Sequence, residues 1–508
     1  MPANANLYAL FASHFPADRS RCCMETQDGR YYSWDVVERA SAKLSNLLAS
    51  LDLQPGARIA VQVEKSPEAL ILYLASLRTG YVYLPLNTAY RHAEVDYFLQ
   101  DAEPEVVICS PINFGWVSQL ALKAGTHHVF TLDAPELDAN TGSLLQCAFS
   151  FSDQFETVQS KPDDLAAILY TSGTTGCSKG AMLTHDNLAS NAKILQQAWA
   201  WSKDDVLLHT LPLFHVHGLF VASHAALLSG SKMIFLAKFN AAQVLHYLPD
   251  TTVFMGVPTY YVRLMQEAGF GRDACRNMRL FISGSAPLLL DTFNEFAQRA
   301  GHTILERYGM SETTMLVSNP YDAARIGGTV GFPLAGVTVR VVKSDQSVCK
   351  TDEIGDIQVR GANVFKGYWR MPEKTAEEFT DDGFFRTGDV GKFDSKGYLS
   401  IVGRSKDLII SGGYNVYPRE IESVIDEMPE VVESAVIGLP HAEFGEAVTA
   451  VLVLRAAAVL SEHTIITRLK NMIANFKVPK QVFIVDKLPR NAMGKVQKNL
   501  LRQQFENQ

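Results

Sequence analysis

Short apolar runs alternate with longer amphipathic stretches over the first two thirds of the chain. The run ARIAVQVEK (57–65) has the length and the β-branched content of a buried strand, and PEALILYLASLRTG (67–80) has the apolar spacing of a helix. The runs VYLPLN, EVVICS, HHVFTL, KMIFLAKF, TVFMGVPT and RLFISGSAP repeat this pattern. Alternation of strands and helices is typical of α/β layers with largely parallel sheets, so we expect that class here.

The pattern changes after about residue 335. VTVRVVKS, GDIQVRG and GYLSIVGR predict closely spaced short strands, and therefore a smaller β-rich lobe. The segment after Arg404 predicts a helix near PREIESVIDEM, strands at ESAVIGLP and AVTAVLVLR, a helix near TIITRLKNMIANF and a last strand at VFIVDKL. A chain of 508 residues is too long for one core. We predict a large N-terminal domain of layered α/β subdomains plus the β-rich lobe (1–403), and a small mobile α+β C-terminal domain (404–508).

Composition narrows the classes of partner. The net charge of −8 provides no overall field that would attract nucleic acid, and no apolar run approaches the ~20 residues needed to span a bilayer. The seven cysteines are scattered and form no C-x-x-C pair, so neither a disulfide framework nor a zinc site is indicated. The N-terminal residues lack the basic and apolar regions of a secretory leader. We expect a cytoplasmic protein without nucleic acid or membrane partners, and the sequence carries no signal for its oligomeric state.

The segment YTSGTTGCSKG (170–180) follows the apolar run LAAIL and precedes an expected helix at HDNLASNAKIL. Its glycines allow successive backbone N–H groups to converge on one anion, and its hydroxyls and its lysine add further donors and a charge. It is not a Walker loop, because Ser precedes the lysine and Gly follows it. Without further motifs, a polar surface loop would be an equally good interpretation. As a triphosphate site, it would use Thr171, Ser172, Gly173, Thr174, Thr175, Gly176 and Lys179.

Five further segments carry residue types that suit a nucleotide: GSAP (284–287), ERYGMSET (306–313), FRTGD (385–389), GRSKD (403–407) and LPRNAMGK (488–495). Tyr308 can stack on a purine, Ser311 can donate a hydrogen bond to a phosphate, and Glu312 offers the hard oxygens that Mg²⁺ prefers. Asp389 can accept hydrogen bonds from both ribose hydroxyls. Taken singly, each residue is more often a core tyrosine, a surface glutamate or a turn aspartate.

Taken together and in this order, these segments resemble the acyl-adenylate-forming superfamily of acyl-CoA synthetases, peptide synthetase adenylation domains and beetle luciferases. The resemblance extends from about residue 30 to residue 498. The family usually has Pro at position 178 and Thr at position 311, where this chain has Ser178 and Ser311. The loss of one rigid residue at position 178 should not disable the loop, and Ser311 keeps the hydroxyl that Thr would supply. The resemblance implies ATP, Mg²⁺ and coenzyme A as ligands: a carboxylic acid is activated as an acyl-adenylate, and its acyl group then passes to the CoA thiol.

The resemblance also implies residue roles. Besides the phosphate loop, the nucleotide site would comprise Gly284, Ala286, Pro287, Glu306, Arg307, Tyr308, Gly309, Ser311, Asp389, Arg404 and Lys495. Lys495 would be the catalytic lysine, aided by His215 and Glu312, and the metal would be held by Glu312 and Thr175. The C-terminal domain would rotate about Lys406. That rotation would withdraw Lys495 and bring up the CoA-binding residues Ser411, Gly412, Gly413 and Tyr414.

Within the family, the chain resembles the malonyl-CoA synthetase subgroup at HVHGLF (215–220), MGVPTYYVRL (255–264), RLFISGSAPL (279–288), ERYGMSET (306–313) and NVFKGYWRMPEKT (363–375). Burying the second carboxylate of malonate unpaired would be costly. Arg263, on a helix expected after Pro258, could bind it in a bidentate fashion, with Ser285 and His215 beside it. Arg279 is the alternative cation, and one of His215 and His217 would be structural. The sequence does not decide between malonate and methylmalonate, which could also fit as a second substrate.

Three other functions remain as alternatives. A ligase for a short fatty or aromatic acid would favour an apolar residue at position 263, where the chain has Arg. An adenylation domain that loads a carrier protein is disfavoured because no carrier domain follows Lys495. A nucleotide sensor without enzymatic activity would be expected to have lost Lys495 or Glu312, and both are present. A luciferase-like monooxygenase has no positive support in these motifs.

Overall fold

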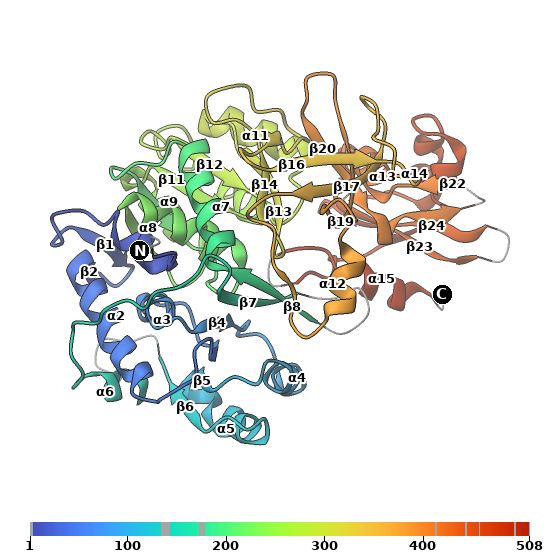
Figure 1. The fold of residues 1–508 in the computed structure, drawn as a ribbon. Coiled ribbons are helices and arrows are strands. Elements are labelled where there is room, and N and C mark those ends of the chain that lie inside the picture. Colours follow the sequence, from blue (N-terminus) through green and yellow to red (C-terminus); the bar gives the residue numbers. More distant parts are fainter. Residues whose placement is uncertain are drawn as a thin grey trace.

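The structure is a computed structural model that describes residues 4–133, 143–171, 178–411, 414–441, 444–456, 458–491 and 494–506. It is an α/β assembly of four sheets, in which a C-terminal lobe lies beside a β-rich lobe (Figure 1). The predicted fold class is confirmed.

The first sheet has the strand order β18-β8-β7-β4-β3-β5-β6. Its central strands are parallel, whereas β8 runs antiparallel to β7 and β18 antiparallel to β8. The strands are β3 (Arg58–Gln62), β4 (Val82–Pro85), β5 (Val106–Cys109), β6 (His128–Thr131), β7 (Leu165–Thr171), β8 (Lys179–Thr184) and β18 (Gly367–Tyr368). The helices α2 (Trp34–Ala49), α4 (His92–Ala102), α5 (Phe114–Lys123) and α6 (Ser143–Ala148) belong to this part of the chain.

The second sheet has the order β15-β14-β13-β12-β11-β9-β10-β1-β2, and its strands are parallel from β1 to β13. The strands are β1 (Cys22–Thr26), β2 (Tyr31–Ser33), β9 (Val206–His209), β10 (Lys232–Phe235), β11 (Val253–Gly256), β12 (Leu280–Ser283), β13 (Leu305–Met310), β14 (Thr314–Ser318) and β15 (Phe332–Pro333). The helices are α1 (Leu7–Ala12), α7 (His185–Ala198), α8 (His224–Ser229), α9 (Ala241–Tyr247), α10 (Pro258–Met265) and α11 (Leu290–Ala300).

Helix α3 (Pro67–Arg78) lies in the common core of both sheets. Every one of its residues is buried. A helix that is apolar all round has to be covered on every side, and the hydrophobic cluster that contains α3 also contains strand residues of both sheets. The predicted helix therefore becomes the centre of the N-terminal core.

The last two sheets form the β-rich lobe and the C-terminal lobe. The antiparallel order β16-β17-β19-β20 joins β16 (Thr338–Val342), β17 (Gly355–Arg360), β19 (Phe385–Phe393) and β20 (Leu399–Arg404), with α12 (Pro372–Glu378) before β19. The C-terminal sheet joins β21 (Ile409–Ser411), β22 (Tyr414–Val416), β23 (Val431–His441), β24 (Gly445–Leu454) and β25 (Gln481–Ile484). Its helices are α13 (Pro418–Asp426), α14 (Glu462–Lys470) and α15 (Lys498–Phe505).

Three details differ from the expectations. The expected helix at HDNLASNAKIL is present as α7, but the strand β8, which pairs with β7, was not predicted between the phosphate loop and this helix. ERYGM lies in β13 and FRTGD in β19, where we had expected segments after a strand and in a turn-rich stretch. Helix α15 was not predicted. In each case the segment is short or polar, and its pairing across the sheet or its packing decides its structure.

The hydrophobic clusters of the described residues separate between Leu399 and Ile409. Arg404 still pairs with Asp389 in the β-rich lobe. The domain boundary at 403/404 remains a prediction. The separation of the hydrophobic clusters is consistent with it.

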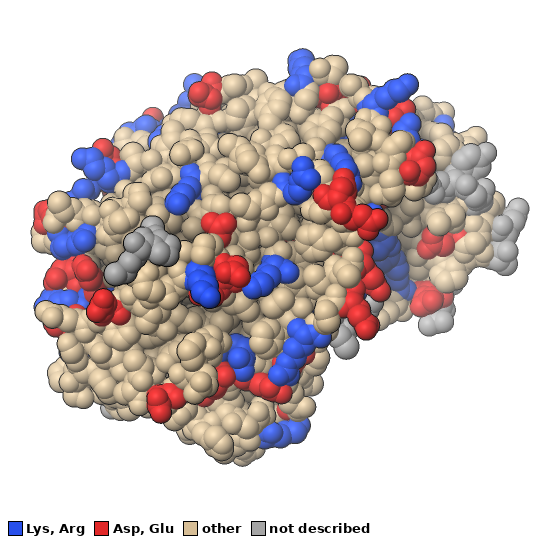
Figure 2. All heavy atoms as spheres, in the orientation of Figure 1, with Lys and Arg blue, Asp and Glu red and all other residues tan. Residues whose placement is uncertain are grey.

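On the face shown in Figure 2, lysines and arginines alternate with aspartates and glutamates and do not form one basic patch. Among the described residues, no helix is both long and apolar enough to cross a bilayer.

Arg279, the alternative cation for binding the acid, forms an ion pair with a buried aspartate. Its Nε and Nη2 lie 2.6 and 2.8 Å from the two carboxylate oxygens of Asp205, and its Nη1 donates to the Trp199 carbonyl at 2.9 Å. Asp205 is only 3% exposed, and the adjacent arginine helps to lower the pKa of its carboxyl group. Arg279 is therefore a structural residue.

We predict that Arg279→Ala lowers the free energy of unfolding by about 2–4 kcal/mol, because it leaves a buried carboxylate without its counter-charge. Urea denaturation would measure the loss. Arg299→Ala, which breaks an exposed pair with Glu295, is the matched control and should cost much less. Equal losses in the two variants would contradict the structural role.

Candidate active site

The phosphate loop is held at its two ends by β7 and β8. Thr171 ends β7 and pairs with Lys179, the first residue of β8. The residues between them that we predict to contact phosphate, Ser172, Gly173, Thr174, Thr175 and Gly176, lie outside the described residues. Their roles stay predictions.

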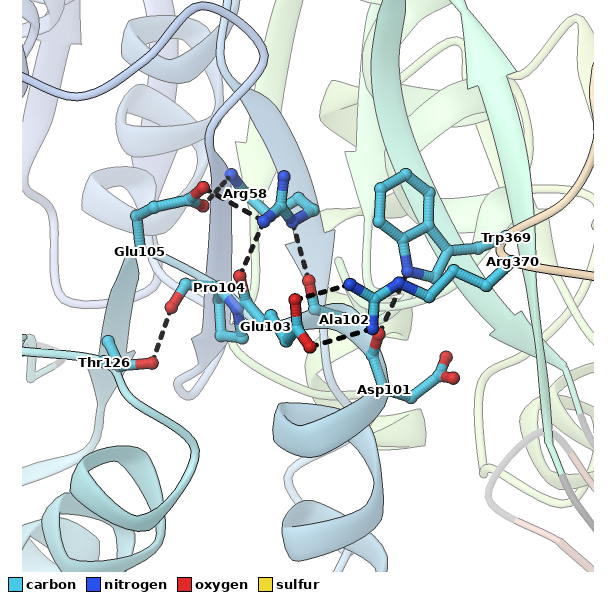
Figure 3. Close-up of polar contacts among 9 residues, drawn as sticks. All are labelled: Arg58, Asp101, Ala102, Glu103, Pro104, Glu105, Thr126, Trp369 and Arg370. Carbon is cyan, nitrogen blue, oxygen red and sulfur yellow. Dashed lines mark hydrogen bonds and ion pairs between the residues drawn. The ribbon is translucent and has the colours of Figure 1, made fainter.

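The segment after β18 is bonded to the end of α4 (Figure 3), and α4 is bonded in turn to the strand that precedes this loop. Tyr170 donates a hydrogen bond to the carboxylate of Asp101 at the end of α4. The indole of Trp369 donates to the Asp101 carbonyl at 3.0 Å, and Arg370 pairs with the two carboxylate oxygens of Glu103 through its Nη1 and Nη2. The segment after β18 is thus tied to α4, which in turn orients the residue that precedes the phosphate loop.

Lys179 and Glu312 lie on either side of Tyr368. The Lys179 Nζ sits 4.2 Å from the centroid of the Tyr368 ring, and the Tyr368 hydroxyl donates to Glu312 Oε1 at 3.1 Å. The Thr171 hydroxyl lies 3.4 Å from the same oxygen. Glu312 is 6% exposed, and burial raises the pKa of its carboxyl group. The carboxylate of Glu312 and the ammonium group of Lys179 therefore lie beside the two ends of the phosphate loop.

Glu312 suits a magnesium ion bound together with phosphates. The described residues contain no group of three or more His, Cys, Asp and Glu side chains able to enclose a metal. Mg²⁺ commonly uses one or two carboxylates and takes its other oxygens from phosphates and water. The donor set at Glu312 and Thr171 fits that mode of binding.

Asp389 lies between Tyr308 and Arg404, two of the residues predicted for the nucleoside. Its carboxylate accepts a hydrogen bond from the Tyr308 hydroxyl at 2.6 Å and lies 3.1 Å from Arg404 Nε. The cross-strand register of β19 and β20 sets Asp389 opposite Arg404. The structure therefore brings together three residues predicted for the purine and ribose, and Asp389 is 5% exposed among them.

Lys495 reaches the same place from the C-terminal lobe. Burial, reinforced by the charge of Arg404, lowers the pKa of its ammonium group to about 8. A Cβ added to the preceding Gly494, which has φ of +74°, would lie 3.3 Å from the Thr259 hydroxyl at the start of α10. The turn that carries Lys495 is thus closed against the N-terminal domain.

Lys406 and the predicted CoA residues belong to the junction and to the C-terminal sheet. Lys406 lies in the 3₁₀ turn Ser405–Asp407 between β20 and β21. Ser411 pairs with Tyr414 and Gly445 within that sheet. Gly412, Gly413 and the side chain of Tyr414 lie outside the described residues, so their roles stay predictions.

The turn after β12 carries Gly284, Ser285, Ala286 and Pro287. Ser285 has φ of +69°, and its hydroxyl lies 3.4 Å from His217 Nδ1. The guanidinium of Arg307 packs directly on Gly284, where an added Cβ would lie 2.3 Å from its Cζ. Only glycine allows this approach.

Arg307 packs on Gly284 but lies on the face of β13 opposite Tyr308, which contacts Asp389. Adjacent residues of a strand point to opposite faces, and Tyr308, the next residue of β13, points to Asp389. Arg307 instead lies close enough to Tyr261, His215 and His217 for its charge to affect their pKa values. We had assigned Arg307 to the nucleotide from the motif alone, and that role stays a prediction; strand alternation was the signal that could have separated Arg307 from Tyr308.

Arg307 is a buried cation with unused donors. It is 4% exposed, and its Nε and Nη2 have no hydrogen-bond partner among the described residues. Burial lowers the pKa of its guanidinium to about 9. Desolvation and the Arg307 charge lower the pKa of His215 to about 4 and that of His217 well below its usual value. The two imidazoles are therefore neutral beside one positive charge.

Arg263 is exposed on α10, one turn after Thr259 and so on the helix face that meets the Lys495 turn. No ion pair to Arg263 is formed within the described part of the chain. The structure thus offers two cations near the predicted acid site, one buried and one exposed.

The remaining predicted residues surround this centre. Glu306 is buried at the start of β13, Gly309 has no room for a Cβ because one would lie 1.9 Å from the Thr314 carbonyl, and Ser311 lies in the turn between β13 and β14. A cavity of about 210 Å³ lies alongside and is lined in part by Thr88, Phe214, Lys238 and Tyr260. Tyr368 was not predicted from the sequence.

Comparisons with known proteins show the family of the chain. The family model described as AMP-binding enzyme matches residues 11–369, and that of the AMP-binding enzyme C-terminal domain matches residues 420–495. A malonate–CoA ligase of Arabidopsis thaliana is 36% identical, over 95% of this chain and 86% of that protein. The crystal structure of ATP-bound MatB from Rhodopseudomonas palustris is 52% identical, covers 99% of both chains and has a TM-score of 0.96. The apo structure of MatB, at the same identity and coverage, has a TM-score of 0.85.

The burial of the Glu306 carboxyl group can be tested by measuring how the stability of the protein depends on pH. Its Oε1 accepts from the Leu288 N–H at 3.3 Å, its Oε2 has no partner among the described residues, and burial raises its pKa from 4.5 to about 7. Between these two values the folded state binds more protons than the unfolded state. The contribution of Glu306 to stability therefore falls as the pH rises through this window.

We predict that Glu306→Gln gains stability relative to the unmodified protein between pH 5 and pH 8, on the order of 1–3 kcal/mol. Thermal unfolding of both proteins at the two pH values measures the difference. Glu295→Gln, at an exposed position of α11, should show no such trend. A difference that does not depend on pH would contradict the buried, proton-binding carboxyl group.

Proposed function

Because the chain belongs to the AMP-binding enzyme family, we propose that it is a malonate–CoA ligase. It would convert ATP, malonate and CoA into malonyl-CoA, AMP and diphosphate through a malonyl-adenylate. The observation that carries the choice of acid is the buried guanidinium of Arg307, whose Nε and Nη2 have no hydrogen-bond partner among the described residues and which lies on the face of β13 opposite Tyr308. The malonate–CoA ligase similar to this chain supports the same choice.

In the first step, the acid carboxylate attacks the α-phosphorus of ATP and diphosphate leaves. Tyr308, Asp389 and Arg404 would hold the nucleoside, and Lys179 would hold the phosphates. Lys495, near Arg404 and Asp389, would supply positive charge where negative charge develops on the α-phosphate, and a charge placed there in advance lowers the barrier. Magnesium bound through Glu312 and Thr175 would neutralise phosphate charge. The chain's own contribution is positioning and charge, which is most of what such a transfer needs.

The second carboxylate of malonate needs a buried counter-charge. Arg307 meets that need because its Nε and Nη2 are already desolvated and have no partner in the described part of the chain. Both N–H groups can bind the two oxygens of one carboxylate. Ser285 and the neutral His217 adjoin it and can complete the hydrogen bonding. Arg263, our first candidate from the sequence, would then lie nearer the exposed entrance.

In the second step, the CoA thiol attacks the adenylate and AMP leaves. We propose that the C-terminal domain rotates about Lys406 between the two steps, as the resemblance implied. The present arrangement is more like ATP-bound MatB than apo MatB, although identity and coverage are equal. With Lys495 beside Asp389, it suits the first step. The cavity beside Tyr260 is our candidate path for the thiol arm.

We place the enzyme in a reducing compartment, with the cytoplasm as our proposal. The six described cysteines are all unpaired, and Cys147 is exposed. An exposed free thiol is easier to keep in a reducing environment.

The acid preference of Arg307 variants tests this function. CoA-dependent AMP formation is measured with malonate, methylmalonate, oxalate, acetate and coumarate. We expect malonate to be preferred, and Arg307→Gln to lower kcat/KM for malonate about 100-fold. The loss with acetate should be much smaller, because acetate has no second carboxylate to pair.

Arg263→Ala is the matched variant. A collapse of malonate preference in this variant alone would move the anchor from Arg307 to Arg263. Preference of the unmodified enzyme for a monocarboxylate would refute the choice of malonate. Thermal unfolding and ATP binding of Arg307→Gln, together with the milder Arg307→Lys, separate an effect on the acid from a loss of folding.

The pKa of Lys495 predicts the pH dependence of the first step. The ammonium is charged below about pH 8 and becomes neutral above it. Acid-dependent exchange of diphosphate into ATP should therefore lose kcat/KM for ATP as the pH rises through about 8, since this ratio reports the free enzyme. Lys495→Arg should be slower but should lack this alkaline loss, because arginine stays protonated. An unchanged alkaline limb in that variant would assign the titration to another group.

A further inference from the structure

Lys179 is paired with a carboxylate that the nucleotide motifs did not include. Its Nζ lies 3.5 Å from Glu378 Oε1, at the end of α12. The Lys179 side chain is 10% exposed and that of Glu378 is 24% exposed. Among the ion pairs of the described residues, Glu378 is the partner of Lys179, so it neutralises a largely buried ammonium group.

Glu378 has a second cation within reach. Lys374, one turn earlier on α12, places its Nζ 3.3 Å from the same Oε1 atom. The carboxylate is thus shared between a buried lysine at the phosphate loop and a more exposed lysine on its own helix. If it gives up Lys179, it keeps Lys374 as a partner and does not become an isolated charge.

A bound phosphate and Glu378 would need the same ammonium group. Under the proposed function, Lys179 holds the phosphates of ATP and then diphosphate. A carboxylate 3.5 Å from its Nζ competes for the N–H donors and repels the incoming negative charge. The same repulsion helps the product to leave once the bond to the α-phosphate is broken.

We propose that Glu378 is a positioning residue that holds Lys179 in the empty enzyme and competes with phosphate groups for it. Glu378 thereby weakens the binding of ATP and of diphosphate, hastens diphosphate release, and passes to Lys374 while phosphates occupy Lys179. The inference rests on the proposed function only in taking Lys179 as a phosphate ligand. It does not depend on the identity of the acid.

Binding of magnesium diphosphate to the full chain, measured by isothermal titration without acid or CoA, tests the competition. Glu378→Gln keeps the shape of the side chain and removes its charge. We expect it to lower the dissociation constant of diphosphate roughly threefold to tenfold. In rapid-quench experiments the variant should also release diphosphate more slowly. Raising the salt concentration should narrow the difference, since screening weakens the repulsion.

Glu377→Gln is the matched control. Glu377 lies next to Glu378 on α12 and pairs with Lys374 at 2.9 Å. The control should leave the affinity for diphosphate unchanged. Weaker binding in Glu378→Gln would overturn the proposal, because it would mean that the carboxylate only orients Lys179. Equal affinities in the two variants would overturn it as well.

Two checks keep the result interpretable. Thermal unfolding shows whether each variant is folded, and Glu378→Asp, which keeps the charge but shortens its reach, should give an intermediate affinity. AMP formation by the unmodified enzyme tests the proposed function separately. An enzyme that binds diphosphate as expected but activates no acid would refute that function and leave the competition at Lys179 intact.

Discussion

Burial of positive charge is the constraint on which the site depends. Lys179, Arg307, Arg404 and Lys495 come from four separate segments and converge in a chain whose net charge is −8. Each buried cation needs a counter-charge or loses part of its ionisation. Lys179 has Glu378 and Arg404 has Asp389, whereas burial lowers the pKa of both Arg307 and Lys495. Within the described part of the chain, Arg307 and Lys495 are the two of these cations that form no ion pair, and they are the two that we place against the reacting acid.

The fold meets this constraint by bringing strand ends and strand pairs together. Asp389 and Arg404 face each other because β19 and β20 are antiparallel neighbours. Arg307 and Tyr308 separate to opposite faces because they are consecutive residues of β13. Lys495 arrives only because the C-terminal turn packs against the start of α10. In this arrangement each charge is thus positioned by backbone pairing or packing of the chain itself, which is the preorganisation that catalysis by charge requires.

The sequence predicted the parts of this site that depend on local composition. The strand and helix alternation predicted α3 and β3 closely, and the motifs named Tyr308, Asp389, Arg404 and Lys495. It did not predict partners from distant segments. The sequence around Tyr368 and Glu378 is typical of an ordinary turn followed by a charged helix. These two residues contact Lys179 because β18 pairs with β8. Arg279 was misjudged for the same reason, since its partner Asp205 is 74 residues away.

The position of Arg307 has a consequence for specificity. Arg307 packs on Gly284, and its strand neighbour Tyr308 bonds to Asp389, so the acid and nucleotide sites share one strand and one turn. A change of side chain at position 307 therefore alters the support of Gly284 as well as the charge available to an acid. Replacing the arginine by an apolar residue would remove a buried cation, and the neutral His215 and His217 would then border an uncharged pocket. Such a pocket would favour a monocarboxylic acid, so under the proposed function position 307 would distinguish dicarboxylic from monocarboxylic acids, while also affecting the support of Gly284.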